Sequence, residues 1–548
     1  MTRTRDRKPT GNHPRNEVGT HRRAAVGAIG PKLSVVGGVA FLLVVLKNAW
    51  ASDDSYIIFR SLEQLFAGNG PVWNAHERVQ VFTSPLWFWL LSIPRTVSHD
   101  VYLNALVFSV ALVAVMLVFM RRALRGNASF LMAVLLLVCC NGFVDFTTSG
   151  LENSLAYALI AFYLSAYVRV FEDDAGAGKS LTHLALAFGL AIVTRHDLSV
   201  LLLPSFAYAL YIWRRHLGGA RWVRLLLIAC GPMAVWSLFA LVYYGSIFPN
   251  SALAKLDTGI AWMDLVRQGG RYLVASVRYD TIAAVAMVAA LVAALRSGKG
   301  WAIALAFGVL ADVAYVVSVG GDFMLGRFLS FAYLVCVLLL GLCVNVRGRP
   351  GPAFAAVLVL GGYALIYPHT PVNSGRNYVN QRRYAGIADE RGVFFEYSSI
   401  YKYIKHAAAA PGARLPYFPA NASSKRGYDI GQGPYKLTDS PMIGFFGYSA
   451  GIRLMIVDRL GLADPLLARL PVADPRTWRI GHFQRAPVPG YYESIASGTP
   501  QIHDPQLNEF YRKVRVITRG RLFSRERLQT IVAMNLGRYD HYLASVRP

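Results

Sequence analysis

The chain has 548 residues, of which 54% are hydrophobic and only 16% are charged. A soluble protein usually carries about 25% charged residues, and the mean hydropathy of +0.37 also lies on the apolar side. The composition therefore argues against a soluble enzyme, a disordered protein or a nucleic-acid-binding domain. The net charge of +25 instead indicates basic loops held on one side of a membrane, with no nucleic-acid partner.

The chain begins with a polar, basic tail at residues 1–32. The apolar stretch 33–50 that follows is long enough to cross a bilayer core of about 30 Å. Asp53 and Asp54 come next, in place of the small residues of a signal-peptide cleavage site, so we expect an uncleaved anchor. By the positive-inside rule the tail is cytoplasmic and Asp53 faces outward.

Ten further apolar segments follow along the chain. They lie near 101–120, 128–146, 151–170, 181–193, 198–213, 222–244, 281–295, 300–319, 327–345 and 352–368. The stretch 83–97 is short, contains Pro85 and Pro94 and is rich in tryptophan, which favours an interfacial or re-entrant helix. Leaving it out keeps Arg121 and Arg122 with the other basic loops in the cytoplasm. The sequence therefore predicts eleven transmembrane helices within residues 33–369.

In this topology the long loops 51–100 and 245–280 lie on the outer side of the membrane. Residues 370–548 contain no run of membrane length, and β-like runs (RLMIVD, VRVIT) alternate there with helix-like ones (PLLARL). This pattern predicts a mixed α/β domain, extracytoplasmic after eleven spans. The predicted fold class is a polytopic α-helical membrane protein with such a C-terminal domain.

Asp53 and Asp54 are the first candidates for chemistry. Ionisable residues at membrane depth are costly, so a group of them on one face of the predicted topology indicates a function. A carboxylate beside a low-dielectric wall gains proton affinity, which suits a general base near neutral pH. The residues leave another interpretation open, in which the pair marks the membrane boundary or caps the helix that starts near Tyr56.

Further candidates lie in the outer loops and at the outer ends of spans. Trp73 and Asn74 offer a stacking face and an amide to a sugar, or belong to a tight turn. Glu152 is a second acid/base, a metal ligand or a carboxylate at a helix start. The other polar residues here that we expect to contact substrate, or to satisfy one another, are Asn153, Arg195, His196 and Asn250.

Two cations are candidates for binding a phosphate. Lys255 lies in the second outer loop, where an ammonium group suits a lipid-borne phosphate or extends to lipid headgroups. Arg327 either binds phosphate or forms a salt bridge with Asp322. No zinc-type spacing of cysteine and histidine occurs, and we predict no metal site.

Six stretches carry a resemblance to a known family. They read SDDSYIIFR, GNGPVWNAHERVQVFTSPLW, TSGLENSLAY, GGDFMLGRFL, DRLGLADPLLARLP and WRIGHFQRAPVP. The sequence resembles the bacterial terminal arabinofuranosyltransferases, integral-membrane glycosyltransferases of the GT-C class, over most of residues 33–500. The last two stretches resemble the outer C-terminal domain of that family.

The resemblance implies a glycosyltransferase of cell envelope biogenesis in the bacterial inner membrane. The donor would be D-arabinofuranose or a similar sugar on a polyprenyl monophosphate, and the acceptor an extracytoplasmic glycan or glycosylated surface structure. The acidic pair of the family corresponds to Asp53 and Asp54, one of which would be the catalytic carboxylate. Lys255 and Arg327 are our own candidates for the donor phosphate.

A monophosphate donor lacks the diphosphate that often requires a metal, so we expect no obligatory metal or cofactor, although a divalent metal stays open. Two alternatives remain at this point. One is a GT-C enzyme that transfers another polyprenyl-phosphate sugar to a lipid or protein, and the other is a transporter or lipid flippase. A basic cluster at 512–527 either docks on anionic lipid or acceptor, or is a solvated helix face.

Overall fold

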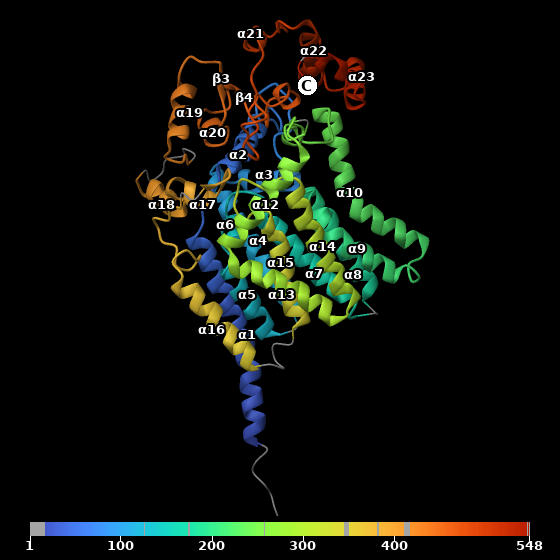
Figure 1. Ribbon diagram of the computed structural model, residues 1–548, viewed down its shortest axis with the longest axis vertical. Helices are drawn as coiled ribbons and strands as arrows, with labels where there is room; N and C mark the ends of the chain where they lie inside the picture. Colours follow the sequence, from blue (N-terminus) through green and yellow to red (C-terminus); the bar gives the residue numbers. More distant parts are fainter. Residues whose placement is uncertain are drawn as a thin grey trace, which may run out of the picture.

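The computed structural model describes residues 17–124, 126–173, 176–256, 258–344, 350–380, 383–409, 417–544 and 546. The first sixteen residues of the predicted tail lie outside this part, as do Arg125, Arg347 and Arg349 of the predicted cytoplasmic loops. Figure 1 shows a helical bundle from whose lower end the first helix, α1 (Glu17–Lys47), extends, whereas the last helices of the chain lie at its upper end.

The bundle is built from helices that follow the predicted apolar segments. After α1 they are α4 (Val101–Ala123), α5 (Asn127–Val138), α6 (Asn141–Phe146), α7 (Asn153–Val170), α8 (Ala177–Thr194), α9 (Leu198–Trp213), α10 (Gly219–Tyr244), α13 (Thr281–Ser297), α14 (Gly300–Ser318), α15 (Leu329–Cys343) and α16 (Pro350–Ile366). Each of the eleven predicted segments contains a helix. Helix α7 is buried along almost its whole length and packs against α4 and α8, which places it inside the bundle.

Four of the described helices are long and apolar enough to cross a membrane, namely α4, α8, α10 and α14. A fifth span results if α12 (Trp262–Tyr279) and α13 count as one, although the pair is bent by 105°. Helices α5, α9, α15 and the Phe354–Ile366 part of α16 are apolar but shorter. The chain is therefore a helical protein with several apolar helices, and the count of eleven spans stays a prediction.

Three shorter helices lie near the upper end of the bundle, together with α12. They are α2 (Asp53–Phe66), α3 (Pro85–Arg95) and α11 (Asn250–Leu253). Helix α3 covers the predicted interfacial stretch, and its 11 residues rise only about 16 Å at 1.5 Å per residue, half of a bilayer core. Helix α2 buries Tyr56, Ile57 and Phe59, so its apolar face is directed into the protein.

The C-terminal segment, residues 370–548, consists of short helices and two small sheets at the upper end of the bundle (Figure 1). Its helices are α17 (Glu390–Ser398), α18 (Ile400–Ala409), α19 (Ala422–Gln432), α20 (Phe445–Ser449), α21 (Tyr491–Ser497), α22 (Pro505–Arg519) and α23 (Arg525–Asn535), with 3-10 helices Leu467–Arg469 and Asp540–Leu543. Strands β1 (Arg383–Tyr384) and β2 (Ile387–Ala388) pair antiparallel, whereas β3 (Leu437–Ser440) and β4 (Met455–Asp458) pair parallel with Leu437 opposite Met455.

The two β-like runs of this segment have different outcomes. RLMIVD contains β4, as predicted. The strand prediction for VRVIT is wrong, because these residues lie in α22. There Phe510, Val514 and Ile517 recur at the spacing of a helix and are buried on one face. The packing of that face outweighs the strand preference of the β-branched side chains.

The C-terminal segment shares a hydrophobic core with the bundle. One buried cluster contains Tyr56 of α2 together with Phe445 and Phe446 of α20. The ring centres of Tyr56 and Phe445 are 4.9 Å apart, and Trp50, at the end of the first long stretch, forms a bridge with Ser399. The segment is thus seated directly on α2, which is where the candidate site lies.

Candidate active site

The site begins at the first turn of α2, directly after the first long helix. Ser52 caps α2, since its hydroxyl accepts a hydrogen bond from Ser55 N at 3.2 Å. Asp53 and Asp54 therefore occupy the first turn, where the helix dipole favours carboxylates. The alternative in which the aspartates themselves cap this helix is wrong, because Ser52 holds the cap position.

The two aspartates have different surroundings. Asp53 Oδ1 accepts a hydrogen bond from Phe445 N at 2.7 Å, at the start of α20. In the described part of the chain, no residue donates a hydrogen bond to the Asp54 carboxylate. Burial raises the pKa of Asp53 to about 7, although the Phe445 N–H opposes the shift. Burial also raises the pKa of Asp54, against the opposing charges of Arg327 and Lys255.

Both aspartates line a cavity of about 300 Å³ between the bundle and the C-terminal segment. Its charged and titratable lining residues are Asp53, Asp54, Glu152, Lys255, Arg327, Arg383, Glu390, Arg479 and His482. The first five were predicted from the sequence and come from four separate stretches of the chain, whereas the last four belong to the C-terminal segment. The volume lies at the lower end of the range for ligand pockets.

Glu152 is held between two arginines at the wall of the cavity. Its Oε1 lies 2.5 Å from Arg195 Nη1 and 3.0 Å from Arg327 Nη2, and the residue is only 2% exposed. Burial alone would raise the pKa of Glu152, but the two arginines lower it to about 2. Glu152 is therefore a fixed negative charge and not a proton carrier near neutral pH.

Arg195 and His196 do not reach the cavity. Arg195 is occupied by Glu152 and by Asp197, whose Oδ2 lies 2.5 Å from Arg195 Nη2. His196 is partly buried, and its carbonyl oxygen accepts from Ser199 Oγ at 2.6 Å. For Arg195 these contacts agree with the interpretation of a polar plug, in which neighbouring charges satisfy one another. The role of His196 stays a prediction.

Arg327 lines the cavity but has several protein partners. Besides Glu152, it donates from Nε to Asn153 Oδ1 at 3.4 Å and lies 3.9 Å from Asp322 Oδ2. Asn153 and Asp322 are buried and do not line the cavity, so they act on it through the arginine. The predicted pairing of Asp322 with Arg327 is present as a long contact.

Trp73 and Asn74 are buried away from the cavity, which corrects the expectation that they meet a sugar. The guanidinium of Arg60 lies 4.4 Å from the centre of the Trp73 ring. Asn74 pairs with the backbone of Ile456, donating to its O at 3.0 Å and accepting from its N at 3.2 Å. Asn74 thereby attaches the first outer loop to the C-terminal segment. Trp73 packs against Gly447 of α20, where an added Cβ would be 2.7 Å from Trp73 Cζ2.

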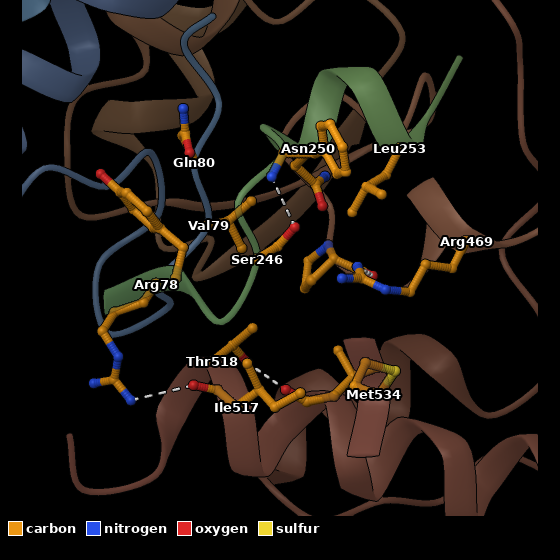
Figure 2. A pocket seen from close by; sticks show the side chains of 14 residues that line it. Arg78, Val79, Gln80, Ser246, Asn250, Leu253, Arg469, Ile517, Thr518 and Met534 are labelled. Atoms are coloured by element: carbon orange, nitrogen blue, oxygen red, sulfur yellow. Dashed lines mark hydrogen bonds between the residues drawn. The ribbon is translucent and has the colours of Figure 1, made fainter. Parts of the chain in front are cut away.

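Asn250 also packs at a seam and not in the cavity. Its Nδ2 donates to Gly461 O at 2.8 Å and to Asp464 O at 3.0 Å. Figure 2 shows Asn250 in a neighbouring cleft, between the loop of Arg78 and the helices that carry Ile517 and Met534. That cleft holds about 20 Å³, little more than one water molecule, so it is packing space.

Glu390, Arg383, Arg479 and His482 were not singled out in the sequence. Glu390 opens α17 and is 6% exposed. Two residues before Glu390, the backbone N–H of Ala388 donates a hydrogen bond to Phe323 O at 2.8 Å. This bond fixes the start of α17 against the loop that carries Arg327. Burial and the charge of Asp54 raise the pKa of Glu390. The stretch WRIGHF was the available indication for Arg479 and His482.

Among the residues that the structure describes, no group of three or more His, Cys, Asp and Glu side chains is arranged to hold a metal ion. The carboxylates and cations that line the cavity suit two kinds of chemistry: proton transfer by an aspartate, and binding of an anion by a lysine or arginine.

No protein-family model matches the chain. It is 28% identical over 237 residues to the terminal beta-(1->2)-arabinofuranosyltransferase of Mycobacterium tuberculosis. The aligned region covers 39% of this chain and 36% of the relative. The chain is 29% identical over 431 residues to the protein of the same name from Corynebacterium glutamicum, covering 66% of this chain and 60% of the relative. The matches thus span less than two thirds of either relative, and they confirm the predicted resemblance.

Two solved structures are similar in shape. They are crystal structures of ArnT from Cupriavidus metallidurans, one bound to undecaprenyl phosphate and one in the apo state. The first has a TM-score of 0.48 and 16% identity and covers 80% of this chain and 87% of that chain. The second has a TM-score of 0.49 and 15% identity, and the match covers 80% of this chain and 88% of that chain.

Proposed function

We propose that this chain is a membrane glycosyltransferase. It moves a D-arabinofuranosyl or similar residue from a polyprenyl monophosphate to a glycan acceptor on the extracytoplasmic side of the bacterial plasma membrane. The observation that carries the proposal is the cavity in which Asp53 and Asp54 meet the cations Lys255, Arg327 and Arg479. The names of the two relatives support the same reaction class.

The position of the cavity suits a lipid-borne donor. A sugar on a prenyl chain arrives from the plane of the bilayer, so its site must lie at the end of the spanning helices. The cavity is lined by the start of α2, by Lys255 just after α11, and by the loop before α15. The C-terminal segment covers it from the other side, so that an acceptor glycan approaches from the water-exposed part of the protein.

The transfer needs a base and a binding site for an anion. The oxygen of the acceptor hydroxyl bonds to C1 of the sugar, while the bond from C1 to the phosphate oxygen breaks and the phosphate keeps its electron pair. The hydroxyl proton passes to a carboxylate. Cations beside the phosphate stabilise the charge that develops on it, and a raised carboxyl pKa makes proton acceptance more favourable.

Asp54 fits the role of this base better than Asp53. Asp53 is tied by its Oδ1 to Phe445 N, and so positions α20 of the C-terminal segment. Asp54 lines the same cavity without a hydrogen bond from any described residue. We therefore assign proton acceptance to Asp54 and a positioning role to Asp53.

The test is a transfer assay on full-length protein with a polyprenyl-phosphate arabinofuranose donor. Asp54→Asn should lower kcat by about 100-fold or more, as expected for loss of a general base, without lowering the melting temperature. Asp53→Asn should lower both activity and melting temperature, because its amide retains only part of the contact with Phe445 N.

The matched control is Asp264→Asn on α12, where the aspartate is exposed and pairs with Arg267. This variant should transfer sugar at the wild-type rate. Wild-type kcat in Asp54→Asn would remove Asp54 from the mechanism. Absence of any glycosidic product from the wild-type protein with this donor, and with donors carrying other sugars, would overturn the proposed function.

A further inference from the structure

The cations of the cavity differ in whether the protein already neutralises them. Arg327 shares Glu152 with Arg195 and has further contacts with Asn153 and Asp322. Arg479, in contrast, forms no salt bridge with any described carboxylate, although it lines the same cavity. The one hydrogen bond of its side chain to a described residue runs from Nε to Gly386 O at 2.8 Å. Neither terminal nitrogen of Arg479 has a hydrogen-bond partner among the described residues, so both can meet a ligand.

The fold holds Arg479 in place through its neighbours. The guanidinium lies 5.5 Å from the ring centre of Phe323, and the His482 ring meets the same phenylalanine edge-on at 4.5 Å. Gly481 lies so close that a Cβ there would be 2.6 Å from Phe323 Cδ1, and its φ of +74° is unfavourable for other residues. The turn 479–482 thus wraps around Phe323 and fixes the arginine at the cavity wall.

A second cation of the same cavity also has no salt-bridge partner among the described residues. Lys255 is exposed and lines the cavity, and no described carboxylate lies within salt-bridge distance of it. Lys255 and Arg479 both act on the Asp54 carboxyl and on His482. His482 itself does not supply positive charge near neutral pH, because burial and Arg479 lower its pKa to about 4.

We infer that Arg479 of the C-terminal segment, together with Lys255, binds the phosphate of the prenyl-linked donor, while Arg327 serves to fix Glu152 and the cavity wall. A guanidinium presents two parallel N–H donors that match two oxygens of a phosphate, and a half-buried one gains more from such a partner than an exposed one. The inference rests on the proposed function and deepens it. It replaces Arg327 by Arg479 as the arginine that meets the phosphate.

The inference gives the C-terminal segment a direct part in donor recognition. Arg479 comes from the segment, whereas Lys255 comes from the membrane-side loop after α11. A phosphate held by both links the two parts of the molecule at the site of transfer. The remainder of the lipid adds no phosphate contact, so the effect of Arg479 should depend on the presence of the phosphate group alone.

The test measures equilibrium binding to the detergent-solubilised full chain by native mass spectrometry. The probes are undecaprenyl phosphate and undecaprenol, which differ only in the phosphate. Arg479→Gln should weaken binding of undecaprenyl phosphate at least 10-fold and leave undecaprenol binding unchanged. The affinity of Arg479→Lys for undecaprenyl phosphate should lie between those of the wild type and Arg479→Gln, because lysine keeps the charge and loses the paired donors. The control Arg476→Gln alters an arginine that is 90% exposed three residues away, and should bind as wild type.

The outcomes separate this inference from the proposed function. Equal binding of undecaprenyl phosphate by wild type and Arg479→Gln would overturn the inference alone. A wild-type protein that does not distinguish undecaprenyl phosphate from undecaprenol would contradict the phosphate donor itself. If Arg479→Gln does not fold, Arg479→Lys with unchanged phosphate binding overturns the inference. Displacement of the probe by phosphatidylglycerol at equal concentration would make this a general phospholipid site and would equally overturn it.

Discussion

Carboxylates that line the same cavity differ in whether they keep their charge near neutral pH, and contact with arginine separates them. Glu152 contacts two guanidinium groups and keeps its charge well below neutral pH. Glu390 is also buried and Asp54 is partly buried, but both lack such a partner among the described residues, and desolvation raises the pKa of each. The carboxylate to which we assign proton acceptance thus has cations nearby but no salt bridge with any described residue.

The pH dependence of transfer follows from the charges around Asp54. The base must be ionised, so kcat should rise with pH along an acidic limb that lies above the ordinary aspartate value of 3.8. Lys255 lowers the pKa of Asp54, so Lys255→Gln should move this limb to higher pH. Lys255→Arg should restore it. The measurement is kcat at saturating donor from about pH 5 to 9, and a limb of Lys255→Gln at the wild-type pH or below would contradict the assignment.

At the scale of elements, the contact between α2 and α20 sets the geometry of the acidic pair. Phe445 N at the start of α20 donates to Asp53, and the preceding Gly444 lies against the same residue. A Cβ on Gly444 would be 1.9 Å from Asp53 O and 2.5 Å from its Oδ2. The absence of a side chain at this position is what allows the two elements to meet.

Gly444→Ala should therefore push α20 away from α2. We expect a loss of about 1–3 kcal/mol of stability, the usual cost of overpacking, and a fall in transfer activity larger than that of Asp53→Asn. The matched control is Gly178→Ala in α8, where an added Cβ meets nothing within 4 Å. Thermal unfolding and the transfer assay report both effects, and wild-type values for Gly444→Ala would mean that α20 does not position Asp53.

At the scale of the whole molecule, buried arginines fasten the C-terminal segment to the bundle. Arg60 of α2 is fully buried and donates to the carbonyl oxygens of Trp73, Gly447 and Leu454. Arg527 is likewise buried and donates to Val242 O and Tyr243 O at the end of α10. Part of the basic excess of the sequence is therefore internal, and Arg527 of the predicted basic cluster is neither a lipid contact nor a solvated residue.

Replacing one of these arginines should loosen the segment as a unit. Arg60→Met leaves the buried carbonyl oxygens of Gly447 and Leu454 without this donor, whereas Trp73 O keeps Gln64 Nε2. We expect each unsatisfied carbonyl to cost about 1–3 kcal/mol. Hydrogen exchange should increase in α19 and α20, and transfer should fall although Arg60 does not line the cavity. Arg521→Met, at an exposed arginine, is the control and should change neither. Unaltered exchange in Arg60→Met would show that the segment is held by its hydrophobic contacts alone.

Much of the helical architecture and part of the site could be predicted from local sequence. Apolar length predicted the helices of the bundle, because each helix satisfies its own backbone and needs only a continuous apolar run. The basic loops placed Asp53, Glu152, Lys255 and Arg327 on one face, and these residues do line one cavity. The length of an apolar run and the charge of a loop depend only on residues that are neighbours in the chain, so both can be read from the sequence.

Other features depended on contacts between distant residues. The strand-like run at 514–518 became helical because its apolar face found a partner in the core. Asn74 and Asn250, loop amides expected to contact a substrate, instead bond to backbone atoms of the C-terminal segment. Arg479 reached the cavity because a turn wraps around Phe323, more than a hundred residues earlier in the chain. Which cation is neutralised and which is free for a ligand is thus decided only by the tertiary structure, since the charge of a side chain is written in the sequence but its partner is not.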